Sequence, residues 1–328
     1  MTDSTPSADA TPMADATAPA TATVVPGASR ASRASTGTPR RKRPRRMDGV
    51  SLTRGQAALR FAVLLAGAIV FLFPFYYMVI GSLQREPDTS LAGAFPNPAN
   101  IDLHNFSTIN DRVNLLQGLL NSGIFTGGVL LCTVVFGLLA GYALAVLQWR
   151  GRGVTFALAL LVQVVPFQLL MIPLYVLIAR DYGLSDNYLG MILPFAINSA
   201  AVVIFRQYFL QIPQEIFDAA RIDGAGELRV LWNVALPLVR PALVTVVLVT
   251  FIGPWNDFLW PFLITKEASM QPLAVSLANY ISNVASSTAN PYGAILAGAV
   301  VLAAPVVVLF IVFQRYFIAT DIGSGVKG

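Results

Sequence analysis

The sequence predicts an all-α integral membrane protein with six transmembrane helices. Of its 328 residues, 55% are hydrophobic and only 12% are charged, whereas about 25% of the residues of a soluble globular protein are charged. A helix needs about 20 predominantly apolar residues to cross a bilayer. Five windows of roughly this length or more contain no charged residue, and a sixth contains a single acid: 61–84, 113–149, 153–179, 187–205, 268–314 and, with the acid, 242–265.

Residues 1–55 are predicted to form a disordered arm in the cytoplasm, and residues 56–328 one transmembrane domain. The arm is rich in Ala, Thr, Ser and Pro, so it has too few large apolar side chains to fold. The stretch RRKRPRR at 40–46 places six positive charges before the first span. We interpret this cluster as a topology signal or a contact with anionic membrane lipid, and we expect no nucleic acid there.

The distribution of Lys and Arg predicts that both termini of this multi-pass plasma-membrane protein lie in the cytoplasm. Cytoplasmic loops carry an excess of these residues. With the N-terminus inside, the outer loops hold four basic and seven acidic residues. The inner loops hold eight basic residues besides those of the arm: Arg150, Arg152, Arg206, Arg221, Arg229, Arg240, Arg315 and Lys327.

Several residues predict how the spans pack and bend. In the second span, Gly137 and Gly141 have the GxxxG spacing that lets helices approach closely, and we favour internal packing over a subunit contact. Cys132 is the single cysteine, and we interpret it as a small packing residue. The outer loop 85–112 is predicted to be extended and rich in turns. Prolines within the spans are expected to kink them, namely those at 166, 173, 194, 254 and 261.

No motif for nucleotide, cofactor or metal chemistry occurs in the sequence. It has no phosphate-binding GxxxxGK[ST] loop and no GxGxxG fingerprint, and its one histidine and one cysteine form no metal-binding pattern. We therefore expect no catalytic residue, no metal and no bound cofactor, and the chain is not predicted to be an enzyme.

The only ionisable residue predicted inside a span is Asp257, in the stretch GPWNDFLWPF. Intramembrane acids are commonly functional, so Asp257 could contact a substrate or an ion together with Trp255 and Asn256. The alternative is a buried, hydrogen-bonded structural carboxylate near the outer interface, where tryptophans commonly anchor helices. We favour the structural interpretation of Asp257.

The segment 211–242 is unusually charged for a stretch between two apolar spans. Pro213 suits a first helical turn, and Glu215 places negative charge near the positive end of that helix. Asp223 and Gly224 form a turn signal, and Gly224 or Gly226 can adopt a positive φ. A second amphipathic helix is predicted with an apolar stripe at i, i+3, i+4 and i+7, made of Leu228, Leu231, Trp232 and Ala235. The segment therefore predicts two short helices beneath the membrane, shaped to fit a protein pocket.

This segment, EIFDAARIDGAGELRVLWNVALPLVRP, resembles the loop that marks membrane subunits of bacterial ATP-binding-cassette (ABC) importers, in particular the carbohydrate-uptake branch. The stretches MIPLYVLIARDYGLSDNYLGMILPF and FIGPWNDFLWPF and the terminal VKG resemble the same branch. The resemblance covers about residues 55–328. It implies the fold of a type I ABC importer permease, similar to the smaller permease of maltose-type importers.

The resemblance also implies a function and partners. The loop would dock onto a separate ATPase, with Asp218 at the position of a family glutamate. The coupling residues would be Glu215, Asp218, Ala219, Ala220, Asp223, Gly224 and Ala225. The implied partners are a second permease, an ABC ATPase dimer that uses the ATP, an extracytoplasmic solute-binding protein and a sugar. Alternatives are an ABC permease for a polyol, glycerol phosphate or amino acid, or a stand-alone gradient-driven carrier.

Overall fold

The computed structural model describes residues 54–283 and 290–324, with side chains described through Gln314 in the second range. Residues 1–53 of the predicted arm, including the basic cluster at 40–46, and the terminal residues 325–328 lie outside these ranges. The last two residues of the predicted arm, Arg54 and Gly55, belong to the first helix. The chain divides into a short unit that ends at Ala58 and a main unit that begins at Leu59. The helices that form the site belong to the main unit.

The main unit is helical, and no strand occurs within the described ranges. Three helices are each long and apolar enough to cross a membrane: α1 (Arg54–Ser82), α3 (Leu115–Ala145) and α14 (Tyr292–Ser324). Three bent pairs also pass this test, and six spans result if each pair is one span. This architecture agrees with the predicted all-α membrane fold.

The bent pairs differ in the sharpness of the bend. The first joins α4 (Arg152–Val162) to α5 (Phe167–Tyr175) and its π-helical extension at 92°. The second joins Tyr188–Phe195, which includes α6 (Tyr188–Ile192), to α7 (Ser199–Phe209) at 50°. The third joins Glu227–Leu238 to α11 (Arg240–Asn256) at 79°.

Of the five prolines expected to kink spans, Pro166 and Pro194 lie at or next to the first two bends. Pro166 sits between α4 and α5 with an extended backbone (φ −62°, ψ 127°), so the helix stops there instead of bending slightly. Pro194 falls in the 3₁₀ turn before α7. Pro173, Pro254 and Pro261 lie inside short or terminal helical segments, in α5, α11 and α12 (Leu259–Ile264).

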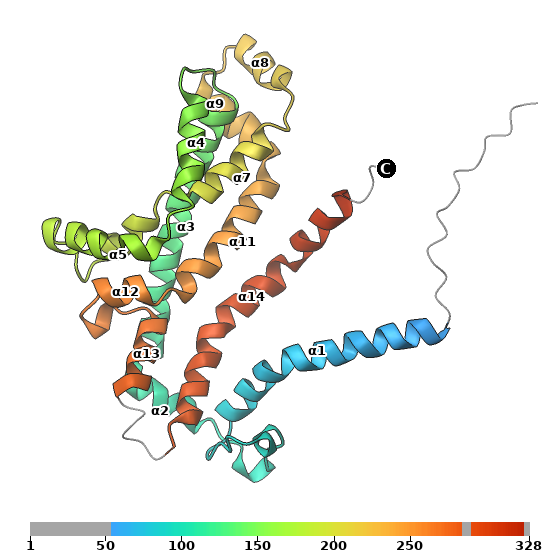
Figure 1. Ribbon diagram of the computed structural model, residues 1–328, viewed down its shortest axis with the longest axis vertical. Helices are drawn as coiled ribbons and strands as arrows, with labels where there is room; N and C mark the ends of the chain where they lie inside the picture. The colour runs from blue at the N-terminus through green and yellow to red at the C-terminus, as the bar shows by residue number, and fades with distance from the viewer. Residues whose placement is uncertain (1–53, 284–289, 325–328) are drawn as a thin grey trace, which may run out of the picture. The chain divides into compact units, whose positions relative to one another are not determined.

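Helix α3 is the centre of the packing, with α7 and α11 against it (Figure 1). A Cβ atom added at Gly141 would lie 2.6 Å from Cβ of Phe205, and one at Gly137 would lie 3.1 Å from Cβ of Ala201. Both glycines therefore allow α3 and α7 to approach closely. The prediction that the GxxxG pair serves internal packing is confirmed.

Two sequence predictions, for residues 85–112 and 268–314, need correction. The loop 85–112, predicted to be extended and rich in turns, contains two 3₁₀ turns but then forms helix α2 (His104–Val113). The window 268–314, predicted as one span, contains a separate helix α13 (Leu273–Asn283) before α14. Helix α13 is apolar because it packs against α2, α3 and α14, and hydropathy alone does not separate such a helix from a span.

Candidate functional site

The loop between α7 and α11 begins with helix α8 (Gln214–Ile222). Pro213 precedes it with an extended backbone, and Glu215 stands in its first turn and Arg221 in its last. Both charges complement the helix dipole. The first short helix of the predicted pair is confirmed.

Gly224 closes α8 through a left-handed turn. Its φ is +83°, whereas that of Gly226 is −69°. The backbone N–H of Ala225 donates to the carbonyl of Ala220, and that of Gly224 donates to Arg221, both at 3.0 Å, which is the pattern of a glycine-terminated helix. Of the two glycines predicted as candidates, Gly224 therefore takes the positive φ.

Helix α8 has one buried and one exposed face. Phe217 is 1% exposed and packs edge-on against Tyr142 of α3, with ring centroids 6.2 Å apart. Ala220 and Ala225 lie partly buried against the same cluster. The other predicted coupling residues are exposed: Glu215, Asp218, Ala219, Asp223 and Gly224.

The second helix of the loop departs from the predicted stripe. It consists of α9 (Glu227–Val230), a π-helical turn at Leu231–Ala235 and α10 (Leu236–Leu238). Leu231 and Ala235 are buried as predicted, but Leu228 is 67% and Trp232 50% exposed. A π turn contains more residues than an α turn, so the stripe no longer faces one side.

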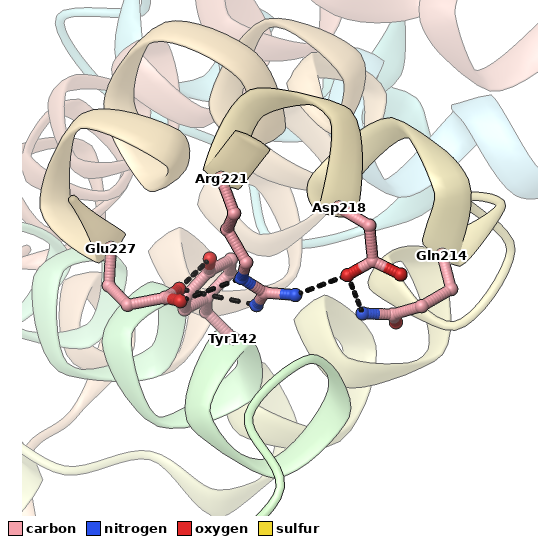
Figure 2. Close-up of polar contacts among 5 residues, drawn as sticks. All are labelled: Tyr142, Gln214, Asp218, Arg221 and Glu227. Carbon is pink, nitrogen blue, oxygen red and sulfur yellow. Dashed lines mark hydrogen bonds and ion pairs between the residues drawn. The ribbon is translucent and has the colours of Figure 1, made fainter. Parts of the chain in front are cut away.

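A chain of polar contacts connects α8 to α3 (Figure 2). The hydroxyl of Tyr142 donates to Oε2 of Glu227 at 2.6 Å, and Nε of Arg221 donates to Oε1 of Glu227 at 2.8 Å. Nη1 of Arg221 donates to Oδ1 of Asp218 at 2.8 Å, and Gln214 donates to the same oxygen at 3.4 Å. The single carboxylate of Glu227 thus bridges two helices.

These contacts also shift the ionisation of the loop. The Arg221 guanidinium, hydrogen-bonded to Glu227, holds the pKa of that carboxyl below its usual value, and the same hydrogen bond raises the pKa of Arg221. Both groups are therefore charged at neutral pH. Neither Tyr142 nor Glu227 was predicted as a site residue, because the two lie 85 positions apart and share no local pattern.

The residues predicted around the intramembrane acid separate into different environments. Asp257 has an extended backbone at the break between α11 and α12. It also lines a cavity of about 330 Å³, with Val129, Phe167, Phe195, Asn198, Val249, Thr250, Gly253 and Pro254. The predicted continuous span 242–265 is therefore broken at this acid.

Trp255 and Asn256 do not line this cavity. The indole N–H of Trp255, a side chain 5% exposed, donates to the carbonyl of Leu302 in α14 at 2.9 Å. Asn256 is exposed and donates to the carbonyl of Ile252 in its own helix. Trp255 is thus a structural contact between α11 and α14. Within the described ranges, no cluster of three or more His, Cys, Asp or Glu residues could hold a metal ion.

Comparison with known proteins identifies the family. The model of the binding-protein-dependent transport system inner membrane component matches residues 133–319. This chain belongs to that family. It is therefore a multi-pass membrane permease, and the type I ABC importer fold implied by the loop is confirmed.

Relatives of this permease align over most of its length. It is 34% identical to the arabinooligosaccharides transport system permease protein AraQ of Halalkalibacterium halodurans, over 80% of this chain and 93% of that protein. It is 33% identical to the melibiose/raffinose/stachyose import permease protein MelC of Bacillus subtilis, over 83% and 98%. A chain of a bacterial ABC transporter involved in the import of the acidic polysaccharide alginate superposes with a TM-score of 0.69 at 26% identity, covering 81% of this permease and 99% of that chain.

Proposed function

We propose that this permease belongs to an ATP-driven sugar importer and that it docks α8 into a cleft of a separate ATPase. The observation that carries this proposal is the exposed face of α8, with Asp218 and Ala219 at its centre. Phe217 anchors the opposite face in the bundle. A helix packed on one face and exposed on the other can bind a partner without unfolding.

The proposed assembly contains a second permease, two ATPase subunits and an extracytoplasmic solute-binding protein. The ATPase binds the ATP, and this chain binds no cofactor. Both termini and the α8 loop lie in the cytoplasm in this proposal, which the excess of basic residues in the inner loops supports. The basic cluster at 40–46 would lie on the same side, against anionic lipid.

The proposed solute is a carbohydrate, as the printed names of the relatives suggest. In this proposal Asp257 lines the solute pathway, because its carboxylate borders a cavity with Phe167 and Phe195. Aromatic rings can pack on the apolar face of a sugar, while a carboxylate accepts hydrogen bonds from its hydroxyls. Asn198 adds an amide to this wall.

Purification of the tagged chain from its own host in mild detergent tests the assembly. We expect mass spectrometry to identify an ATPase and a second six-span permease. Asp218→Arg and Gly224→Asp should release the ATPase but leave membrane insertion intact. Asp111→Arg, the same change at an exposed aspartate on α2, should retain it. If both Asp218→Arg and Gly224→Asp retain the ATPase, docking through α8 is refuted.

The solute is tested on the binding protein of the same assembly. Calorimetry with arabinotriose, raffinose and sn-glycerol 3-phosphate separates an oligosaccharide from a phosphorylated polyol. Binding of a sugar supports the proposed substrate class. Binding of glycerol phosphate alone would replace it by the alternative.

A further inference from the structure

We infer that Tyr142, Glu227 and Arg221 form a tie that carries movement of α8 into the membrane-spanning helix α3. The inference rests on the proposed docking of α8, but it concerns the step after docking. The three residues are positioning residues in this view, since they would not contact the ATPase or the solute. Their contribution is to make α8 and α3 move together.

Two kinds of side-chain contact connect α8 to α3. The first is apolar, between the rings of Phe217 and Tyr142. Apolar contact is non-directional, so it would let α8 slide over the bundle when pulled. The second is the polar chain from Arg221 through Glu227 to the Tyr142 hydroxyl. Hydrogen bonds depend steeply on distance and angle, so this chain resists sliding.

The surroundings of Tyr142 fix its hydroxyl in place. The side chain is 4% exposed, and its ring lies edge-on to Phe209 of α7 at 5.5 Å and to Phe217 at 6.2 Å. Phe217 moves with α8, so the contact with Phe209 of α7 is the one that limits rotation of the Tyr142 ring when α8 is displaced. In this proposal, displacement of Glu227 either breaks the 2.6 Å hydrogen bond or carries α3 along.

The exposure of the contacting side chains indicates which contact contributes most to the tie. The side chains of the Arg221–Asp218 pair are 30% and 54% exposed and those of the Arg221–Glu227 pair 30% and 45% exposed, and surface ion pairs of this kind contribute little by themselves. The Tyr142–Glu227 bond ends on a buried ring, where a lost partner leaves an unsatisfied group. The tie is therefore strongest at its α3 end, and Asp218 remains available to a partner.

Helix α3 leads from the tie to the cavity wall. Val129 lines the cavity that contains Asp257, and it lies 13 residues before Tyr142 on the same continuous helix, from 129 to 142. At 1.5 Å per residue this separation is about 20 Å. A rigid helix of that length transmits a displacement at one end to the other.

Hydrogen exchange of the purified assembly in lipid nanodiscs, with and without MgATP and vanadate, tests the tie. In the wild type we expect nucleotide to change exchange both in α8 and at the Tyr142 end of α3. Tyr142→Phe removes only the hydroxyl, and Glu227→Gln removes the charge that binds Arg221. Either variant should keep the response of α8 and reduce that of α3 by roughly 5-fold or more, the lower end of typical coupling between two sites.

The double variant and a matched control sharpen the result. Both substitutions interrupt the same chain of hydrogen bonds. The double variant Tyr142→Phe with Glu227→Gln should therefore reduce the α3 response no more than either single variant. Tyr208→Phe removes a hydroxyl from another tyrosine at the same cluster and should leave the α3 response unchanged. An unaltered α3 response in both single variants would overturn the tie while docking stands. No response of α8 in the wild type would overturn docking, and the tie with it.

Discussion

Gly141→Ala tests the α3–α7 contact, and the geometry predicts that this substitution lowers stability. In Gly141→Ala the new Cβ would meet Cβ of Phe205 at 2.6 Å and the backbone nitrogen of Arg206 at 3.0 Å. Neither atom is the end of a flexible side chain, so the helices must separate. Overpacking of this kind costs about 1–3 kcal/mol, partly offset by the gain of about 0.5–1 kcal/mol when alanine replaces a helical glycine.

Gly127→Ala is the matched control in the same helix, because a Cβ there meets no atom within 4 Å. Its intrinsic helical gain equals that of Gly141→Ala, so the difference between the two variants isolates the overpacking. Thermal unfolding of the purified chain in detergent should place Gly141→Ala below Gly127→Ala by about 2–4 °C for each kcal/mol. Equal midpoints for the two variants would refute the close approach of α3 and α7 at this residue.

Three further predictions concern the loop and the cavity. Gly224→Val should destabilise the folded end of α8 by about 1–2 kcal/mol, because an L-residue is disfavoured at a φ of +83°. Gly226→Ala should not destabilise it, and limited proteolysis of the loop compares the two variants. Gly253→Leu should place a larger apolar side chain in the cavity at Asp257, where a Cβ at Gly253 meets nothing within 4 Å. Uptake assays should then show lost transport with normal ATPase recovery. The lowered pKa of Glu227 predicts that its contribution to stability is complete above the usual pKa of 4.5 and is lost as pH falls through the lowered value; proteolysis of α8 between pH 6 and pH 3 follows this loss.

Local sequence patterns predicted the short-range features of the loop well. The start of α8 after Pro213 and the positive φ of Gly224 both depend on residues a few positions apart. The same holds for Gly141, whose spacing from Gly137 marks a close helix contact. Such features are determined by backbone sterics, which a sequence displays directly.

Features that depend on distant residues were missed. The bond between Tyr142 and Glu227 joins residues in different elements, and neither residue has a local pattern that identifies the other. The exposure of Trp232 depends on a π turn that no local signal predicted. The proline at 166 predicted a kink, but no local signal indicated a bend as large as 92°. The cavity that Asp257 lines is also formed by Val129, Phe167 and Asn198, which lie far from it in the sequence.

The long separation between Tyr142 and Glu227 has a consequence for biogenesis. Because the two residues are 85 positions apart, a ribosome must synthesise α3, α7 and α8 before this hydrogen bond can form. A nascent chain stalled before Glu227 would hold α8 through the contact of Phe217 with Tyr142, without the hydrogen bond. The support of α8 is therefore completed in two steps during synthesis, the apolar contact first and the polar one second.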